Sequence, residues 1–177
     1  MDILFVCTGN ICRSPLAERM LQQIVSEQGL DVRVSSAGTR ALNGQPMHPQ
    51  SERVLIERGI EPGPFESRML TAAMAEHSDL VLGMTRQHRA FARQLAPARW
   101  KRMFALRELN PAGRGDAAGV RSRAGFGPTD SQLDIEDPIN RPGEVFDRIG
   151  GVIFESMAPV IAWIGRRETG AYPPINT

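Results

Sequence analysis

Two cysteines, an arginine and a serine lie close together in the segment CTGNICRSP, residues 7–15. The chain has only two cysteines in 177 residues, and both Cys7 and Cys12 fall in this segment. A thiolate is a strong nucleophile, and thiols beside an arginine at a helix N-terminus ionise more readily than free thiols. The planar fork of donors on an arginine such as Arg13 can hold two phosphate oxygens at once. These residue types at this spacing favour nucleophilic chemistry on a bound phosphate.

The residues on either side of this segment predict a strand before it and a helix after it. Residues 2–6 form the short apolar run of a parallel strand that is buried on both faces. From Pro15, apolar residues recur at helical spacing as far as Gly29, which suits the position just past a helix end. Ser14 fits the N-cap, and Pro15 fits the first helical position. The opening unit is therefore predicted to be a strand, a loop and a helix.

A loop of this kind can form an anion site at the carboxyl edge of a sheet. Backbone N–H groups and the positive end of the following helix point at whatever lies there. We expect the amides from Thr8 to Arg13 to surround a dianion, with Cys7 at the floor. Gly9 is expected to supply the positive φ that such a curl needs. The segment lacks the GxxxxGK[ST] pattern of nucleotide-binding loops, so nucleotide binding is disfavoured.

The rest of the chain alternates between strand and helix patterns. Further strands are predicted at 31–36, 78–84 and 101–106, and further helices at 48–59 and from Thr85 to Leu95. A final helix carries an apolar stripe from Val145 to Ile164, and Pro159 should kink or split it. Strands that alternate with helices imply right-handed crossovers and a parallel sheet. The predicted fold class is three-layer α/β with helices on both faces of the sheet.

The domain organisation is predicted to be simple. Residues 110–132 break every periodic pattern and are rich in Gly, Arg, Ser and Asp, which is typical of a flexible insertion. Too little chain follows to make a second domain, so residues 1–169 are predicted to form one domain. Residues 170–177 are expected to be a frayed tail.

Composition excludes several classes of protein. Hydrophobic residues make up 41% and charged residues 23%, as in ordinary globular proteins. The net charge of +1 argues against a nucleic-acid surface. The first apolar run is about five residues long and carries Asp2, unlike a signal peptide or a membrane span. We expect a cytoplasmic monomer that does not bind membranes and holds no metal, because His48, His77 and His88 lack metal-ligand spacing and read as solvent-facing or capping residues.

CTGNICRSP resembles the signature of the low molecular weight protein tyrosine phosphatases, CxxxxxR followed by Ser. The resemblance continues in VSSAGT at 34–39, in the pair Ser67 and Arg68, in VLGMTRQHR at 81–89 and in a late Asp-Pro. It implies a four-stranded parallel sheet of flavodoxin-like order and a phosphocysteine intermediate. It also implies that no cofactor is needed, that the substrate is a tyrosine-phosphorylated protein and that phosphate is the product.

The same resemblance implies roles for individual residues. Cys7 would be the nucleophile, Arg13 the phosphate clamp and Ser14 a hydrogen-bond donor to the thiolate. Asn10 would hold the loop in a strained curve through Ser36.

Asp137 would be the general acid, and the residue types support this role independently. A leaving oxygen needs a proton as its bond to phosphorus breaks. Pro138 keeps Asp137 out of the helical region, just before the last helix. Asp130, Asp134 and Glu136 are nearby carboxylates that read as ordinary solvated charges.

The expected rim of the site departs from the family pattern. Phosphotyrosine phosphatases of this family usually carry aromatic side chains where this chain has Leu42 and Ile139. The loop residue Ile11 resembles the tyrosine-phosphatase branch, whereas related protein-arginine phosphatases carry a threonine there. Phe65 also replaces a histidine that is common before the Ser-Arg pair. The missing aromatic pair should change substrate selection without altering the chemistry.

Three further functions remain as alternatives to a phosphotyrosine phosphatase. The same fold could act on phosphoarginine or small phosphoesters. Arsenate reduction on this scaffold needs additional cysteines to relay a disulfide, and this chain has none outside the loop. A non-catalytic phosphate-binding module would need neither a nucleophile nor an acid. Cys12, five residues after Cys7, could form a disulfide that protects Cys7 from irreversible oxidation.

Overall fold

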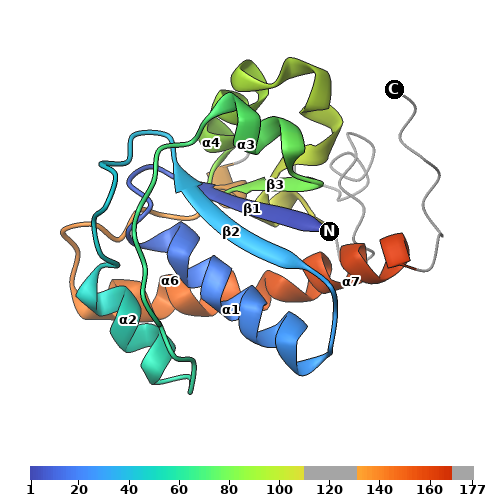
Figure 1. Cartoon of the computed structure of the whole chain (residues 1–177). Helices are drawn as coiled ribbons and strands as arrows, with labels where there is room; N and C mark the ends of the chain where they lie inside the picture. Colours follow the sequence, from blue (N-terminus) through green and yellow to red (C-terminus); the bar gives the residue numbers. More distant parts are fainter. Residues whose placement is uncertain (110–130, 169–177) are drawn as a thin grey trace.

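The structure is a computed structural model that describes residues 1–109 and 131–168. Four parallel strands form one sheet in the order β2-β1-β3-β4, with helices on both faces (Figure 1). This arrangement confirms the predicted three-layer α/β class and its flavodoxin-like strand order. The strands are β1 (Asp2–Cys7), β2 (Arg33–Gly38), β3 (Leu80–Gly83) and β4 (Met103–Ala105).

The apolar run of β1 occupies the middle of the sheet because it is paired on both edges. Ile3 is in register with Val34 of β2 and with Leu80 of β3. Successive side chains of a strand point to opposite faces. Ile3 and Phe5 accordingly belong to one core cluster, whereas Leu4 belongs to the other. A strand buried in this way holds the residues that follow it in a fixed position at the carboxyl edge of the sheet.

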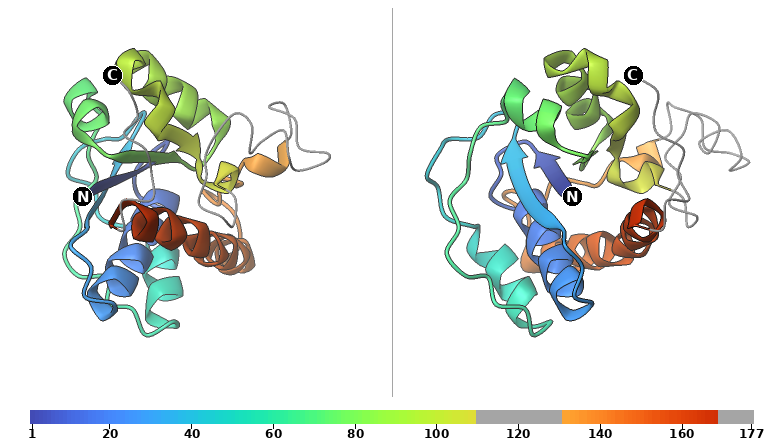
Figure 2. Two further views of the ribbon diagram at one scale, coloured as in Figure 1. Left: turned by 90° about the vertical axis from the view of Figure 1, so that its right-hand side faces the viewer. Right: turned by 45° about the vertical axis from the view of Figure 1, so that its right-hand side comes forward.

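The two faces are covered by different helices (Figures 1 and 2). The larger core lies under α1 (Arg13–Glu27), α2 (Pro49–Ile56), α6 (Gly143–Glu155) and α7 (Met157–Glu168). The smaller core lies under α3 (Ala72–His77) and α4 (Arg86–Leu95). Thr71 and Thr85 cap these last two helices through their hydroxyl oxygens. The pattern predicted all of these helices except α3, which is only six residues long.

The last helical stretch is split in two. α6 ends at Glu155 and α7 begins at Met157, with Ser156 between them. A proline inside a helix lacks the N–H that would bond to the carbonyl four residues earlier. Glu155 is that residue for Pro159, so the break confirms the predicted effect of this proline.

Most of the predicted insertion at 110–132 and all of the predicted tail at 170–177 lie outside the described residues. The final residues of the insertion belong to a short 3-10 helix, η3 (Ser131–Leu133). Within the described part of the chain, none of the helices is long and apolar enough to cross a bilayer.

Candidate active site

The CTGNICR segment lies at the carboxyl end of β1, at the point where the strand order reverses. Ligands in open α/β sheets bind at this kind of position. The end of β2 packs closely against the loop: a Cβ added to Gly38 would lie 2.5 Å from the Thr8 carbonyl oxygen and 2.9 Å from the Asn10 nitrogen. Just beyond, the Thr39 amide donates to the Cys7 carbonyl at 2.9 Å. Glycine in the SAGT motif therefore allows β2 to hold the loop in place.

Cys7 lies at the floor of the loop with its sulfur surrounded by donors. The side chain is 2% exposed, the Asn10 amide donates to Sγ at 3.2 Å, and Ser14 Oγ lies 3.0 Å from Sγ. Ser14 Oγ also accepts from Asn10 Nδ2 at 3.0 Å, so its own hydrogen can go to the sulfur at 3.0 Å or to the more distant Ala37 carbonyl at 3.5 Å. Two groups that can donate hydrogen bonds, the Asn10 amide and the Ser14 hydroxyl, therefore lie within reach of the sulfur.

The predicted N-cap role of Ser14 is wrong. α1 begins two residues earlier than predicted, at Arg13 instead of Pro15, so Cys12 takes the cap position without a side-chain cap hydrogen bond. Ser14 is inside the first turn, and its hydroxyl points at Cys7 rather than at a helix amide. The Ser14 side chain therefore contacts the Cys7 sulfur and does not cap the helix.

The strained residue of the loop is Asn10, not Gly9. Asn10 has φ of 55°, and Gly9 is not among the positive-φ residues, so the prediction for Gly9 is wrong. Asparagine tolerates the left-handed region because its short amide can bond locally. Asn10 Nδ2 donates to Ser36 Oγ at 2.8 Å, and Oδ1 accepts from the Arg68 amide at 2.9 Å. The buried side chain thus fixes the loop to β2 and to the Ser-Arg pair.

Glu18 ends this network and was missed by the sequence reasoning. Ser36 donates from Oγ to Glu18 Oε2 at 2.5 Å, and the glutamate is only 8% exposed. Glu18 lies four residues after Ser14, so the two share one face of α1. That spacing was the available signal, although a glutamate in a helix is usually solvated.

Arg13 joins the loop to the distant Asp-Pro segment. Its side chain is 3% exposed, Nη1 donates to the Ile135 carbonyl at 2.9 Å, and Nη2 contacts both Thr8 Oγ1 and Asp137 Oδ2. Nε is buried and has no hydrogen-bond partner among residues 1–109 and 131–168. A buried donor without a partner is costly, so the Nε–H group is suited to donate to an oxygen of a ligand.

Asp137 lies at the exposed side of the site. Its side chain is 40% exposed, one oxygen faces Arg13, and the other accepts from the Ile139 amide at 3.2 Å. The neighbouring carboxylates have other partners: Asp134 pairs with Arg86, and Glu136 pairs with Arg148. Asp130 lies outside the described residues. Of the described carboxylates in this segment, Asp137 is the one in contact with Arg13.

The second cysteine of the loop, Cys12, is held in its neutral form. Both are free thiols. Burial, followed by the nearby charges of Cys7 and Asp137, raises the pKa of Cys12 to about 12. Cys12 is therefore a neutral thiol at physiological pH, which leaves Cys7 as the candidate nucleophile.

The aliphatic residues expected at the rim are at the surface. Leu42 is 75% exposed and Ile139 is 40% exposed, while Ile11 is half-buried against the larger core. The Leu42 carbonyl accepts from Ser67 Oγ at 2.5 Å, which anchors its loop to the Ser-Arg pair.

His88 is buried, contrary to the prediction for it. It is 6% exposed, with Nε2 3.0 Å from Thr8 Oγ1 and Nδ1 2.9 Å from Thr85 Oγ1. Burial, followed by the charge of Arg13, lowers its pKa to about 4. His48 caps α2 as expected, accepting from the Gln50 amide at 3.2 Å. His77 is exposed, with Nδ1 2.7 Å from the Ala73 carbonyl oxygen of its own helix.

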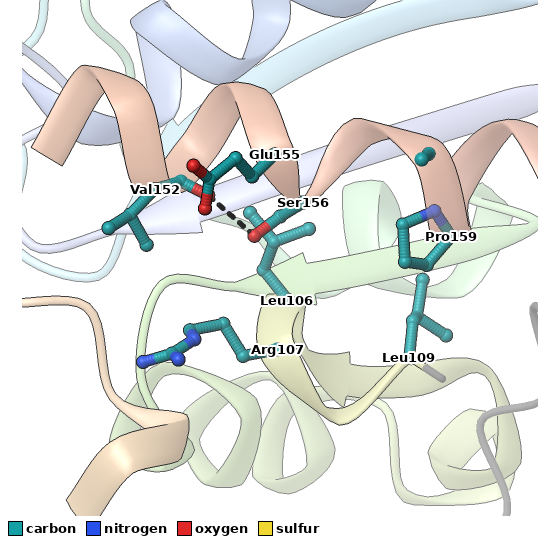
Figure 3. Close-up of a pocket in the computed structure, with 8 residues that line it drawn as sticks. Leu106, Arg107, Leu109, Val152, Glu155, Ser156 and Pro159 are labelled. Atoms are coloured by element: carbon teal, nitrogen blue, oxygen red, sulfur yellow. Dashed lines mark hydrogen bonds between the residues drawn. The ribbon is translucent and has the colours of Figure 1, made fainter. Parts of the chain in front are cut away.

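A separate hollow lies between the 3-10 helix η2 (Leu106–Glu108) and the junction of α6 and α7 (Figure 3). It is lined by Leu106, Arg107, Leu109, Val152, Glu155, Ser156, Ala158 and Pro159. The Ser156 hydroxyl is occupied by the Val152 carbonyl at 2.7 Å. None of the cysteine-loop residues lines this hollow. Among the described residues, no group of three His, Cys, Asp or Glu side chains could hold a metal ion.

Comparisons with known proteins agree with this geometry. A sequence model described as low molecular weight phosphotyrosine protein phosphatase matches residues 2–167. The protein-arginine-phosphatase of Bacillus subtilis (strain 168) is 42% identical over 117 residues, covering 66% of this chain and 77% of that protein. The low molecular weight protein-tyrosine-phosphatase Etp of Escherichia coli (strain K12) is 32% identical over 153 residues, covering 86% of each.

Solved structures show the same fold. A mutant of the YwlE arginine phosphatase with a phosphorylated active site serine superposes with a TM-score of 0.78 and 28% sequence identity. The match covers 96% of this chain and 99% of that one.

Proposed function

Since the chain belongs to the low molecular weight phosphotyrosine protein phosphatase family, we propose that it hydrolyses phosphotyrosine in proteins through a phosphocysteine on Cys7. The observation that carries this proposal is the convergence of Cys7, Arg13 and Asp137 at one edge of the sheet. A phosphate-binding protein would require neither an activated thiol nor an acid beside the arginine. The network around Cys7 therefore supports turnover over binding alone.

Phosphate binding falls to the loop and to Arg13. The Nε and Nη2 groups of Arg13 form a fork that matches two oxygens of a phosphate, and a bound phosphate would take the place of the Asp137 carboxylate on Nη2. The N-terminus of α1 supplies a positive end to the same site. The arginine is held from behind by the Ile135 carbonyl, so its orientation is set before the substrate arrives.

The chemistry proceeds in two steps. The Cys7 thiolate attacks phosphorus, the bond from phosphorus to the tyrosine oxygen breaks, and Asp137 gives that oxygen its proton. Water then attacks the phosphocysteine, Asp137 takes the proton, and phosphate leaves with the thiolate restored. Asp137 is exposed enough to meet the leaving group and close enough to Arg13 to face the same phosphate.

Phosphoarginine is the second candidate substrate. It is favoured by the 42% identity to the protein named as a protein-arginine-phosphatase. Ile11 argues against phosphoarginine, because the related protein-arginine phosphatases carry a threonine at this position. The half-buried isoleucine offers an apolar contact and no hydrogen bond to a guanidinium.

Hydrolysis of para-nitrophenyl phosphate in the presence of EDTA tests the activity itself. We expect turnover without added metal, and a wild-type protein that binds phosphate but does not turn over this ester would refute the enzyme. A phosphotyrosine peptide and a matched phosphoarginine peptide, compared by kcat/KM, then separate the two substrates. Higher kcat/KM for the phosphoarginine peptide would overturn the proposed specificity.

We also propose that Cys12 protects Cys7 during oxidation. Peroxide would convert the Cys7 thiolate to a sulfenic acid, and the Cys12 sulfur would displace water from it to form a disulfide. Activity lost to peroxide should return with dithiothreitol in the wild type and not in Cys12→Ser, each measured against its own starting activity. Equal recovery in both proteins would contradict this role.

A further inference from the structure

His88 is a buried titratable side chain that neither step of the proposed reaction uses. It belongs to the first turn of α4, beyond β3, and reaches across the carboxyl edge of the sheet to Thr8 on the cysteine loop. Thr8 Oγ1 in turn accepts from Nη2 of Arg13 at 3.4 Å. His88, Thr8 and Arg13 thus form one chain of contacts. It runs from α4, which follows β3, to the cysteine loop, which follows β1.

The local backbone is built to bring His88 to this place. A Cβ on Gly83, at the end of β3, would lie 2.9 Å from the His88 Cβ and 2.8 Å from the Arg89 nitrogen. Only glycine leaves room for the first turn of α4 to pack so closely against the strand. Thr85 caps that helix by accepting from the His88 amide at 3.3 Å, and its hydroxyl also meets the ring at Nδ1. Strand end, cap and ring are therefore fixed together.

The hydrogen bonds of the ring are complete while it is neutral. If Nδ1 carries the proton, it donates to Thr85 Oγ1, and the Thr8 hydroxyl donates to Nε2. If Nε2 carries the proton, it donates to Thr8 Oγ1, and the Thr85 hydroxyl donates to Nδ1. In both tautomers Thr8 Oγ1 keeps a lone pair for Arg13. The ring therefore fixes the position of the Thr8 oxygen without competing for it.

The charges around the ring also favour its neutral form. Arg13 faces it from the cysteine loop, while Asp134 and Asp137 face it from the segment before α6. Burial and the arginine outweigh the two carboxylates, which agrees with the low pKa of the ring. A cation at this place would repel the guanidinium that has to hold the phosphate.

We propose that His88 is a positioning residue that orients the Arg13 guanidinium through the Thr8 hydroxyl. This role rests on the proposed function, because it concerns the residue assigned there to hold the phosphate. His88 does not touch the reacting atoms, so its effect should be seen in phosphate affinity rather than in the bond-breaking step.

Five proteins test the proposal: the wild type, His88→Ala, His88→Gln, Thr8→Val and the double variant Thr8→Val/His88→Ala. The measurements are the inhibition constant of inorganic phosphate, kcat and KM for para-nitrophenyl phosphate, and thermal unfolding. Loss of one buried hydrogen bond corresponds to an affinity change of about 3- to 10-fold. His77→Ala, at an exposed position of α3, is the matched control and should leave phosphate affinity unchanged.

We expect His88→Ala and Thr8→Val each to raise the phosphate inhibition constant and KM with little change in kcat. The double variant should be no worse than Thr8→Val, since both changes break the same chain of contacts. His88→Gln should keep near wild-type affinity because its amide can still meet Thr8 Oγ1. The proposal would be overturned if the fold-losses of phosphate affinity in the two single variants multiplied in the double variant. Unchanged phosphate affinity in Thr8→Val would also overturn it.

Two complications have defined outcomes. If His88→Ala does not fold, the other two single variants test the proposal. Phosphate affinity must then fall in Thr8→Val and stay near the wild-type value in His88→Gln. If the wild type binds phosphate without turning over any ester, the proposed enzyme fails, whereas phosphate affinities measured by calorimetry still confirm or refute the chain from His88 to Arg13.

Discussion

The two sides of the candidate active site are built differently. On the Cys7 side, Asn10, Ser14 and Ser36 are at most 2% exposed, and each is hydrogen-bonded to another member of the network. On the other side, Asp137 is 40% exposed and Leu42 is 75% exposed. A buried, satisfied network has one geometry, whereas exposed side chains can adapt to what approaches. The proposed nucleophile is thus held in one geometry, whereas the side with Asp137 and Leu42 can adapt to what approaches.

Removal of the nucleophile should have the largest effect of all. Cys7→Ser is expected to lower kcat for para-nitrophenyl phosphate by about 10⁴-fold or more, because a serine hydroxyl is not ionised at neutral pH. Phosphate or vanadate binding should persist, since the loop amides and Arg13 remain. Cys12→Ser removes the other thiol and should retain turnover. Full activity in Cys7→Ser would refute the thiolate mechanism.

Loss of the acid should depend on the leaving group. Asp137→Asn is expected to slow an alkyl or unactivated aryl phosphate by about 10²- to 10⁴-fold, the usual contribution of a positioned acid. An ester whose leaving group is already a good one should be affected much less. Glu136→Gln, at the neighbouring carboxylate, is the control. Equal losses on both kinds of ester would argue against proton donation by Asp137.

Disruption of the buried network should appear in stability as well as in activity. Asn10→Ala leaves the buried Ser36 hydroxyl short of a partner, at a cost of about 1–3 kcal/mol, and removes the part-buried hydrogen bond of the Arg68 amide, worth about 1 kcal/mol. Denaturant unfolding should therefore show a loss of about 2–4 kcal/mol, and kcat should fall with it. Asn43→Ala removes a similar acceptor of the Met69 amide at an exposed position and should cost far less. Equal losses of unfolding free energy in Asn10→Ala and Asn43→Ala would contradict the proposed difference in rigidity between the two sides of the site.

Acid should also act on the buried side through His88. The pKa of its ring falls from 6.5 to about 4 on folding, so the unfolded chain binds a proton at pH values where the folded chain does not. Stability is therefore lost as pH falls from 6.5 towards 4, by about 3 kcal/mol at about 1.4 kcal/mol per pKa unit. His88→Gln should flatten this part of the pH dependence of unfolding, and His77→Gln is the control. An unchanged slope in His88→Gln would contradict the burial of a neutral ring.

The smallest effect is expected at the rim. Leu42→Trp and Ile139→Tyr should lower KM for a phosphotyrosine peptide by about 2- to 10-fold, since an aromatic pair contributes about 0.5–1.5 kcal/mol beyond its area. The inhibition constant of inorganic phosphate should not change, because phosphate has no ring to stack. Ile56→Trp places an aromatic side chain at an exposed position on α2 as the control. A change in the inhibition constant of inorganic phosphate would mean that these rim residues also affect phosphate binding by the cysteine loop.

The sequence predicted what is local and missed what is assembled across the sheet. β1, the cysteine loop and α1 are consecutive in the sequence. The spacing of apolar residues and the residue types were therefore enough to place Cys7 and Arg13 in the same loop between strand and helix. Ser14 has the composition of an N-cap, yet a sulfur on the neighbouring strand competes for its hydroxyl. A histidine on a polar helix such as α4 is usually solvated, and only the packing of that helix against β3 buries His88.

The same lesson applies to the loop backbone. Glycine has the lower cost at positive φ, so Gly9 was the natural choice for the curl. Asn10 takes that conformation instead because its amide gains partners on β2 and beside Arg68, and these partners are far away in the sequence. Side-chain networks of this kind cannot be derived from spacing, because the spacing that matters exists only after the strands have paired.

The bond from Arg13 to the Ile135 carbonyl has a consequence for the order of events during folding. It joins residues 122 positions apart, and the contact of Thr8 with His88 joins residues 80 apart. Closing such long loops is entropically slow compared with local contacts. A nascent chain that has not yet reached Asp137 holds Cys7 but lacks both the Ile135 support for Arg13 and the proposed acid. The proposed activity therefore requires synthesis as far as Asp137, and recovery of activity after unfolding reports that the long-range contacts of Arg13 and Thr8 have formed.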